Sequence, residues 1–408
     1  MAGEKILIGQ SGGPTAAINA SLAGICEEAK RIGAAEIFGM RYGIEGFLQG
    51  KVCSLGQALE AQGALALLCR TPSSFLGSCR CKLPDPAEDE TVCAKVLSAL
   101  ETRGLSAFFY IGGNDSMDTI EKLSRYGSAK GSPVRFIGVP KTIDNDLCLT
   151  DHTPGYGSAA KFIAVSLSEI LCDATVYDIP SVTVVEIMGR NAGWLTGAAS
   201  LSALSGGPGP DLVLLPEAAF DEEAFLARLT ALLRQKPGLV VAISEGIRGA
   251  DGTLLCEKGA PGAATDAFGH RAILSGAGEY LAGRIRARLG CKARAVDLSI
   301  LQRCASHLAS AADLTEAQRA GAAAMQAAAA GETGCMVAFR RADAEAYACE
   351  TVTVPVGQVA NREKKVPREW ITADGMQVTD AFVHYAAPLI QGEAAPVWQN
   401  GVPCHLHL

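Results

Sequence analysis

The chain has little that would place it in a membrane, on a nucleic acid or outside the cell. No run approaches the roughly 18–20 consecutive apolar residues that a membrane-spanning helix needs. Its 36 Lys and Arg against 43 Asp and Glu give a net charge of −7, whereas nucleic-acid proteins usually carry a basic surface. The opening Met-Ala-Gly-Glu-Lys lacks the charged and apolar regions of a signal peptide. We therefore expect a cytoplasmic protein with no membrane and no nucleic-acid partner.

The 14 cysteines also lack the spacing of a metal site or a disulfide framework. No Cys-x-x-Cys occurs, the closest pair is Cys79 and Cys81, and Cys404-His405-Leu406-His407 ends the chain. No second cluster supplies the remaining ligands of a structural zinc. We expect unpaired thiols in a reducing compartment.

What the chain does have is length and apolar residues. A single core rarely grows beyond roughly 250–300 residues, so 408 residues that are 49% hydrophobic predict two domains. Short, nearly continuous apolar runs alternate with helical patterns, which is typical of parallel strands covered on both faces in an α/β fold. The runs are Lys5–Gly9, Ala107–Ile111, Val134–Val139, Val182–Met188, Leu212–Leu215, Leu239–Ile243, Cys335–Phe339 and Thr351–Val356.

Between these runs the spacing of apolar residues indicates helices and loops. Ile18, Leu22, Ile25 and Ala29 recur at helical spacing and predict a helix after the first strand. The alanine-rich stretch 317–330 predicts another helix, ended by Gly331. The Gly-rich stretch 246–262 predicts a hairpin or a mobile loop.

Five of the apolar runs end in glycine and a polar cluster, and this pattern points to a ligand site. In open α/β sheets, ligands bind outside the carboxyl ends of the strands. One Gly-rich turn can be a structural necessity, but five together exceed what turns require. The clusters are Gln10–Gly13, Gly112–Ser116, Pro140–Asp146, Gly189–Asn191 and Ser244–Gly246.

The first of these clusters favours a phosphate. Gly12-Gly13 opening a helix would supply free amides and the positive end of the helix dipole. No G-x-x-x-x-G-K-[ST] occurs, which disfavours a P-loop kinase. No G-x-G-x-x-G followed by an acid occurs either, which disfavours a dinucleotide-binding fold.

The acidic residues of two other clusters suit a magnesium ion and a general base. Asn114, Asp115, Asp144 and Asp146 offer the hard oxygen ligands that Mg²⁺ prefers. If the segment is extended, Asp144 and Asp146 project to one side with Thr142 in line. One carboxylate could then lie near a metal while the other accepts a proton.

The ordered motifs SGGP, GGNDS, PKTIDND, MGRNAGW, SEG and LQR, from residue 11 to about 303, resemble those of the 6-phosphofructokinases. The resemblance implies two Rossmann-like three-layer α/β/α domains with mostly parallel sheets and an active site between them. It implies a phosphoryl-donor domain of residues 1–155 plus about 304–350. A sugar-phosphate domain would comprise residues 156–303 plus about 351–408.

The resemblance also implies roles for individual residues. Asp144 resembles the general base that takes the proton from the 1-hydroxyl of fructose 6-phosphate, and Thr142 contacts the same end of the sugar. Asn114 falls where the family has a magnesium-binding Asp, and Gly12 and Arg80 would lie against the phosphoryl donor. The expected sugar-phosphate contacts are Met188, Gly189, Arg190, Glu245, Arg294 and Arg303, with Arg294 reaching across from a neighbouring subunit.

Two positions indicate the phosphoryl donor. ATP-using members of the family have Gly at both, whereas pyrophosphate-using members have Asp and Lys, as this chain has Asp115 and Lys141. A carboxylate there should crowd and repel the α-phosphate of a nucleotide, while an ammonium can neutralise the transferring group or leaving phosphate. The resemblance therefore implies reversible, Mg²⁺-dependent phosphoryl transfer from pyrophosphate to fructose 6-phosphate, giving fructose 1,6-bisphosphate and phosphate.

Several positions depart from the family pattern. Asn114 replaces an Asp, Ser181 replaces a subunit-crossing Arg, and Ile300 replaces a His. Ala23 and Glu27 occupy the places of effector-binding arginines, which disfavours nucleotide regulation there.

The alternatives are an ATP-dependent 6-phosphofructokinase and a non-catalytic regulatory paralogue. The intact TIDND and MGR motifs disfavour a non-catalytic subunit. Activity on sedoheptulose 7-phosphate also stays open. The subunit-crossing arginine implies a homodimer or a homotetramer.

Overall fold

The computed structural model describes residues 2–259, 276–344 and 346–408, and the chain forms two compact units. Unit 1 comprises Met1–Ser158, Arg303–Glu363 and Gln391–Leu408, and unit 2 comprises Ala159–Gln302 and Lys364–Ile390. The sequence led us to expect all of 351–408 in the second domain. Part of that stretch lies in unit 1 instead, because β11 (Cys349–Pro355) pairs with β10 (Cys335–Arg341) in the sheet of unit 1.

Unit 1 is built on a seven-stranded sheet in the order β11-β10-β5-β4-β1-β2-β3. The five central strands, from β10 to β2, run parallel, whereas β3 and β11 are antiparallel to their neighbours. The other strands of the sheet are β1 (Lys5–Gln10), β2 (Glu36–Met40), β3 (Val52–Ser54), β4 (Leu105–Gly112) and β5 (Arg135–Pro140).

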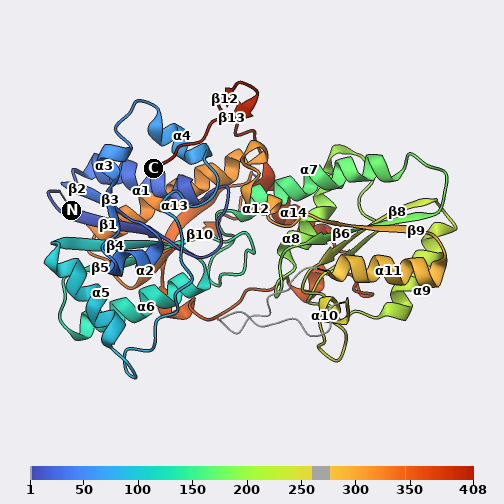
Figure 1. Ribbon diagram of the computed structural model, residues 1–408, viewed down its shortest axis with the longest axis horizontal. Coiled ribbons are helices and arrows are strands. Elements are labelled where there is room, and N and C mark those ends of the chain that lie inside the picture. The colour runs from blue at the N-terminus through green and yellow to red at the C-terminus, as the bar shows by residue number, and fades with distance from the viewer. Residues whose placement is uncertain (1, 260–275, 345) are drawn as a thin grey trace. The chain divides into compact units, whose positions relative to one another are not determined.

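Helices cover both faces of this sheet (Figure 1). Because side chains alternate along a strand, Ile6 and Ile8 pack with α1 and α13, and Leu7 packs with α5 and α6 on the opposite face. This burial explains why the strands read as continuous apolar runs. The helices are α1 (Ile18–Ile32), α2 (Gly43–Leu48), α3 (Leu55–Ala58), α4 (Ala64–Arg70), α5 (Thr91–Thr102), α6 (Asn114–Ala129) and α13 (Ala311–Ala329).

Glycines allow α1 and α13 to pack closely. A Cβ on Gly24 would lie 2.0 Å from the Gln318 carbonyl oxygen, and one on Gly321 would lie 2.1 Å from the Ser21 carbonyl oxygen. Both are backbone atoms, which cannot move away by a side-chain rotation. The two helices therefore touch through their main chains, and each needs a residue without a side chain at the contact.

Unit 2 is built on a four-stranded parallel sheet in the order β7-β8-β6-β9. Helices α9 and α11 pack on one face, with Phe225 and Leu281 against Val184, and α7 lies across the other face (Figure 1). The strands are β6 (Ser181–Ile187), β7 (Leu212–Leu214), β8 (Gly238–Ser244) and β9 (Lys292–Asp297). The helices are α7 (Tyr156–Ala174), α8 (Trp194–Gly197), α9 (Glu222–Leu233), α10 (Leu255–Gly259), α11 (Ala277–Leu289) and α14 (Asp380–Ala386). Helix α12 (Leu301–Cys304) begins in unit 2 and ends in unit 1.

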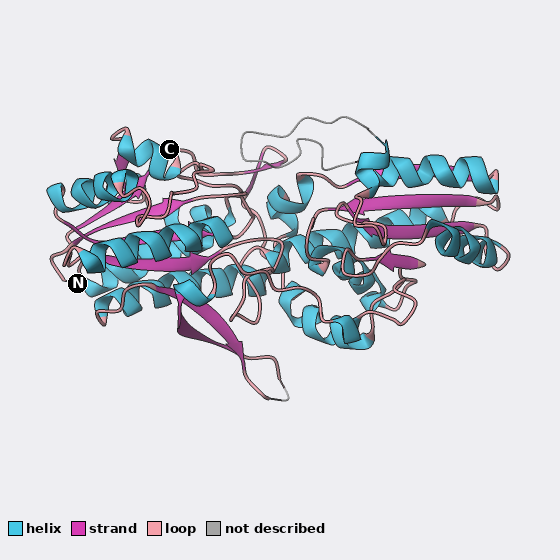
Figure 2. Ribbon diagram, turned by 90° about the horizontal axis from the view of Figure 1, so that it is seen from below, coloured by secondary structure: helices cyan, strands magenta, loops and turns pink. Residues whose placement is uncertain are grey.

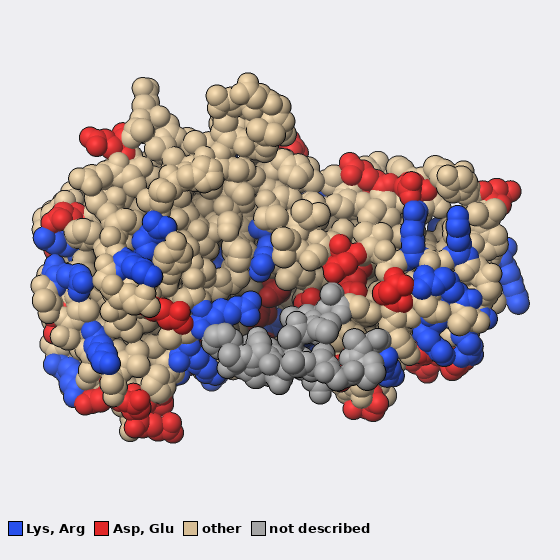
Figure 3. Space-filling model, viewed as in Figure 1, with Lys and Arg blue, Asp and Glu red and all other residues tan. Residues whose placement is uncertain are grey.

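Basic side chains gather at the right-hand end of the view in Figure 3, with acidic side chains around them. Each of the three arginines of α11 lies within 2.8 Å of a glutamate. Arg284 and Arg288 pair with glutamates of α9, and Arg286 pairs with a glutamate of α11 itself. The basic side chains of α11 are thus paired with acids. These pairs neutralise the most basic helix of unit 2.

All eight apolar runs form strands, which confirms the α/β prediction. The sequence did not reveal β2, β3 and β9, because these strands are short or polar on one side. The stretch 246–262 was expected to be a hairpin or loop, and it contains both an Arg248–Leu254 bridge and the short helix α10. Residues 260–262 of that prediction lie outside the described residues.

The tail ends in a small hairpin of β12 (Trp398–Gln399) and β13 (Val402–Pro403), and the longer hairpin of β10 and β11 extends the sheet of unit 1 (Figure 2). All 14 cysteines are free thiols. Within the described ranges no helix has the length and hydropathy to cross a membrane.

Replacing Gly321 with Ala should destabilise the chain, because the new Cβ forces α1 and α13 apart. Overpacking of this kind costs about 1–3 kcal/mol, which outweighs the intrinsic helix preference of Ala. The measurement is urea denaturation followed by circular dichroism. Gly283→Ala on α11 is the control, since its Cβ would meet nothing closer than 3.8 Å and should stabilise by up to about 1 kcal/mol. Equal stability of the two variants would contradict the close contact.

Candidate active site

Three of the five predicted polar clusters meet in unit 1. Strands β1, β4 and β5 are neighbours, so their carboxyl ends lie side by side. Ser11 N donates to the Ile111 carbonyl at 3.0 Å, and Lys141 N donates to the Gly112 carbonyl at 3.0 Å. The hydroxyls of Ser11 and Ser116 are also hydrogen-bonded. Main-chain and side-chain bonds thus join the turns after all three strands.

The glycine turn after β1 differs from our expectation. Helix α1 begins at Ile18, and the Thr15 hydroxyl accepts hydrogen bonds from the amides of Ala17 and Ile18 at 3.2 and 2.9 Å. Gly12 N donates to the Cys79 carbonyl at 3.3 Å. The prediction that Gly12-Gly13 opens the helix was therefore wrong, because a threonine inside the turn caps it.

Helix α6, which follows β4, begins without a side-chain cap. Its N-cap is Gly113, and Asn114 and Asp115 form its first turn. The Asn114 amide nitrogen donates to the Arg362 carbonyl at 2.8 Å, and its Oδ1 is buried with no hydrogen-bond partner among the described residues. A buried oxygen without a donor fits a hard cation such as Mg²⁺. Asp115 beside it is exposed.

Lys141 lies at the centre of the unit 1 cluster. Its side chain is only 2% exposed, and Nζ donates to the Gly13 carbonyl at 2.6 Å. A Cβ on Gly12 would lie 3.4 Å from Nζ. Burial lowers the pKa of Lys141 to about 8, although Asp144 and Asp146 oppose this shift. The buried ammonium thus lies against the glycine turn, where its charge can attract an anion.

Two arginines lie near the same ammonium. Arg303 and Arg80 both lower the pKa of Lys141 through their charge. A Cβ on Gly13 would lie 3.5 Å from Arg303 Nη1. Arg303, which the resemblance associates with the sugar phosphate, thus belongs to unit 1 and lies against the glycine turn. Arg80 is exposed.

The segment after Lys141 has the alternation that the sequence predicts. Lys141, Ile143 and Asn145 are buried, whereas Thr142, Asp144 and Asp146 are partly exposed. Asp144 N donates to the Thr142 hydroxyl at 3.1 Å. Thr142, Asp144 and Asp146 therefore share the more open side of this segment, and both carboxylates lie close enough to influence Lys141.

The other two polar clusters meet in unit 2, after the neighbouring strands β6 and β8. Gly189 N donates to Glu245 Oε1 at 3.1 Å, and the Ser244 hydroxyl donates to the Gly189 carbonyl at 2.7 Å. Gly189 has φ +119°, which only glycine adopts without strain. These bonds place the main chain of Met188–Arg190 against the side chain of Glu245.

Glu245 carries a raised pKa of about 7. Burial is the largest cause, and the charges of Glu186 and Asp297 add to it, while the Gly189 amide and Arg190 act in the opposite direction. A carboxyl group held this way exchanges its proton near neutral pH. It can accept a hydrogen bond from a sugar hydroxyl when ionised.

Arg294 does not join either cluster. It lies within β9, where Nη2 contacts Asp173 Oδ2 at 2.6 Å and Nε donates to the Thr183 hydroxyl at 3.2 Å. Its side chain is 59% exposed. Ile300, one of the departures from the family pattern, is also exposed, and Ser181 begins β6.

The sequence reasoning missed a supporting residue that one of its motifs contained. Gln302 of the LQR motif is buried, and its Oε1 accepts the Met188 amide at 3.1 Å. Only the neighbouring Arg303 was singled out, although a buried glutamine beside it needs a partner. Trp194 packs with Trp370, Phe382 and Tyr385.

Comparison with known proteins agrees with the motifs. The phosphofructokinase family model matches residues 5–328. A pyrophosphate–fructose 6-phosphate 1-phosphotransferase of Xanthomonas campestris is 40% identical over 100% of this chain and 97% of its own. A pyrophosphate-dependent phosphofructokinase of Nitrosospira multiformis has a TM-score of 0.88 at 35% identity, covering 98% of this chain and 95% of that structure. This chain therefore belongs to the phosphofructokinase family.

Proposed function

We propose that this chain transfers a phosphoryl group from pyrophosphate to the 1-hydroxyl of fructose 6-phosphate. The products are fructose 1,6-bisphosphate and phosphate, and the similar energies of the two phosphoryl donors make the reaction reversible. The observation that carries this proposal is the buried Lys141 ammonium beside Gly12, with Asp144 on the open side of the same loop. Relatives with this donor match the chain over nearly its whole length.

In the proposed mechanism, Asp144 accepts the proton of the sugar 1-hydroxyl as its oxygen attacks phosphorus. The new bond is O1–P, and the bond to the bridging oxygen of pyrophosphate breaks, so that phosphate leaves. Lys141, with Arg80 and Arg303 nearby, neutralises charge on the transferring and leaving groups. Thr142 holds the same end of the sugar. Asp115 excludes the longer nucleotide donor by repelling an additional phosphate.

Enzymes of this family generally use a divalent metal, and we propose that Asn114 contacts Mg²⁺ here. Its buried Oδ1 without a donor supports this assignment. Bound Mg²⁺ would neutralise the oxygens of pyrophosphate. Because Asn carries no charge, the nearby Asp115 supplies the negative charge on the metal side of the site.

We assign the sugar phosphate to Met188, Gly189, Arg190 and Glu245, as their shared strand ends support. Arg294 would reach a sugar phosphate bound by a second subunit, which makes the enzyme a homodimer or a homotetramer. Its exposed guanidinium supports that assignment. A location in the cytoplasm, where these sugar phosphates occur, stays a prediction.

We expect turnover with pyrophosphate and little with ATP when fructose 6-phosphate and Mg²⁺ are supplied. The measurement is an aldolase-coupled assay with each donor in turn. The double variant Asp115→Gly, Lys141→Gly should gain ATP use and lose most pyrophosphate use. Strong use of ATP by the wild type would overturn the donor assignment, and no turnover with either donor would favour a non-catalytic paralogue.

Asp144→Asn should lower kcat by about 10²–10⁴-fold, the usual contribution of a positioned base. Asp146→Asn is the matched control, since it lies two residues on and shares the same open side. That control should lose less than about tenfold in kcat, because its carboxylate only supports the charge balance of Lys141. A larger loss in Asp146→Asn than in Asp144→Asn would assign the base to Asp146.

Glu245→Gln should stabilise the chain at pH 8 and weaken binding of the sugar. The pKa of Glu245 in the folded chain, about 7, lies above the ordinary value of 4.5. The free energy of unfolding therefore has its full contribution from the protonated acid below pH 4.5 and loses it as the pH rises through 7. Thermal melting should show a higher Tm for the variant at pH 8 and no difference at pH 4. The KM for fructose 6-phosphate should rise about tenfold. A Tm difference independent of pH would contradict the raised pKa.

A further inference from the structure

The loop that follows β5 (residues 141–155, the β5 loop) is held in place by its own returning half. Thr142 N donates to the Pro154 carbonyl at 3.2 Å, and the Thr153 hydroxyl donates to the Thr142 carbonyl at 2.8 Å. Thr153 N donates to Asn145 Oδ1 at 3.0 Å. Asp144 lies between Thr142 and Asn145, so its position depends on where residues 150–155 are fixed.

The returning half is fixed against β10. Asp151 N donates to the Phe339 carbonyl at 2.9 Å, and Phe339 N donates to the Thr150 hydroxyl at 2.9 Å. The ring of His152 stacks on Phe339 with the ring centres 4.7 Å apart and the planes 2° from parallel. The next residues are held by α13, where Asp313 accepts the Gly155 amide at 2.8 Å.

His152 joins these supports through both ring nitrogens. Nδ1 lies 2.9 Å from Asp151 Oδ2, and Nε2 lies 2.8 Å from Glu316 Oε2 on α13. The ring is 2% exposed and Glu316 is 5% exposed. A neutral imidazole carries only one N–H, so the ring donates to both carboxylates only when it is an imidazolium. Burial lowers the pKa of His152, but the bonds to Asp151 and Glu316 outweigh burial and raise it.

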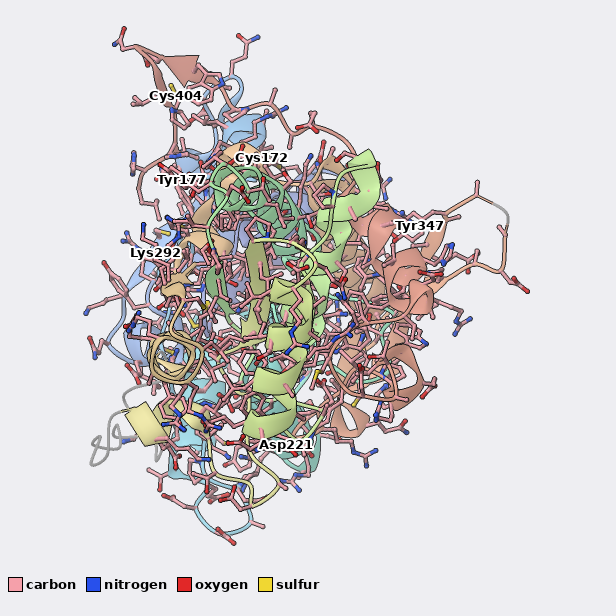
Figure 4. The ribbon with its side chains drawn as sticks, turned by 90° about the vertical axis from the view of Figure 1, so that its right-hand side faces the viewer. Cys172, Tyr177, Asp221, Lys292, Tyr347 and Cys404 are labelled. Carbon is pink, nitrogen blue, oxygen red and sulfur yellow. The ribbon has the colours of Figure 1, made fainter. Side chains whose placement is uncertain are left out.

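The two carboxylates also have further partners. Tyr347 donates to Glu316 Oε1 at 2.8 Å, and Arg341 Nη2 contacts Asp151 Oδ2 at 2.9 Å. Tyr347 lies on the segment that joins β10 to β11 (Figure 4). The titratable groups around the ring are Asp151 of the β5 loop, Asp313 and Glu316 of α13, Arg341 of β10, Tyr347 between the strands and Cys349 of β11.

A metal ion is the competing explanation, because one ligand-type atom each of His152, Glu316 and Cys349 lies within 4.8 Å of the others. Two observations favour a proton instead. The imidazole and the carboxylate already bond to each other at 2.8 Å, and the Arg341 charge lies on Asp151 next to them.

We propose that His152 is a positioning residue for phosphoryl transfer: its imidazolium joins α13 to the β5 loop and thereby fixes Asp144. The inference rests on the proposed role of Asp144 as the base. His152 does not touch the reacting atoms. It acts by keeping residues 150–155, and through them Thr142 and Asn145, in one conformation against β10 and α13.

The first test compares His152→Phe and His152→Gln with the wild type. Phe keeps the stacking on Phe339 but loses both hydrogen bonds, and should lower kcat 10- to 100-fold with KM values for both substrates within threefold. Gln keeps one donor and should restore part of kcat. Gln326→Met is the control, because it removes a 2.9 Å bond between α13 and Glu28 far from the β5 loop and should leave kcat within twofold.

The second test follows pH and requires the Glu316→Gln variant. Loss of the ring proton removes one of the two hydrogen bonds that tie the ring to Asp151 and Glu316, so kcat should fall as the pH rises through the pKa of His152. Removing the Glu316 charge lowers that pKa, and the alkaline fall in kcat should move to lower pH. An alkaline limb at the same pH in the variant and the wild type would overturn the imidazolium assignment.

Hydrogen exchange separates this inference from the proposed function, because it needs no substrate. In His152→Phe, amides of residues 141–155 should exchange at least tenfold faster, with α1 and β4 unchanged. Unchanged exchange in the loop, or a His152→Phe defect confined to KM, would overturn the inference. Stoichiometric metal in purified wild type that is absent from His152→Phe would also overturn it. If His152→Phe speeds exchange in residues 141–155 as expected but the wild type shows no turnover with pyrophosphate, the proposed function would be overturned instead.

Discussion

The bond from the buried Lys141 ammonium to the Gly13 carbonyl is the constraint on which the arrangement of unit 1 depends. An ammonium without water needs compensating charge and hydrogen bonds. Asp144 and Asp146 supply part of the charge, while Arg303 and Arg80 oppose it. Burial and the two arginines outweigh the two carboxylates, so the pKa of Lys141 is lowered. An added anion would stabilise the charged ammonium. The loop after β5 and the turn after β1 are therefore positioned by the same group that attracts the ligand.

Strand order explains how residues far apart in the sequence come to share a site. The carboxyl ends of β1 and β5 are 130 residues apart in the sequence, with the end of β4 between them. The three strands are parallel neighbours in the sheet, so their ends lie side by side. In unit 2 the same rule brings Gly189 and Glu245 together. Burial, together with the charges of Glu186 and Asp297, raises the pKa of Glu245. Both halves store unfavourable charge where a ligand is expected, which is the usual relation between stability and function.

Much of this arrangement was readable from the sequence, and the exceptions have physical reasons. Continuous apolar runs identified strands that are buried on both faces, but β9 (KARAVD) is an edge strand with exposed side chains and gave no such signal. The prediction that the two glycines open α1 was wrong because the Thr15 hydroxyl accepts the hydrogen bond of the first helical amide, that of Ile18. The glycine pattern gives no indication of this bond. The alternation of burial around Asp144 agrees with the expectation, although residues 143 and 144 form a bend and Asn145 has φ +55°. The anchoring of His152 could not be read from the sequence, because Glu316 and Phe339 are more than 160 residues away.

The path of the chain has a consequence for how the protein is made. The chain passes between the units after residues 158, 302, 363 and 390, and the helix that packs on α1 is Ala311–Ala329. During synthesis, the first 158 residues leave the ribosome without α13, β10 and β11, so the face of the sheet that carries α1 is only partly covered. Unit 2 emerges next and can acquire most of its core earlier than unit 1. Nascent chains that stop before about residue 330 would therefore expose the apolar faces of Ile18 and Leu22, and such fragments are candidates for chaperone binding and degradation.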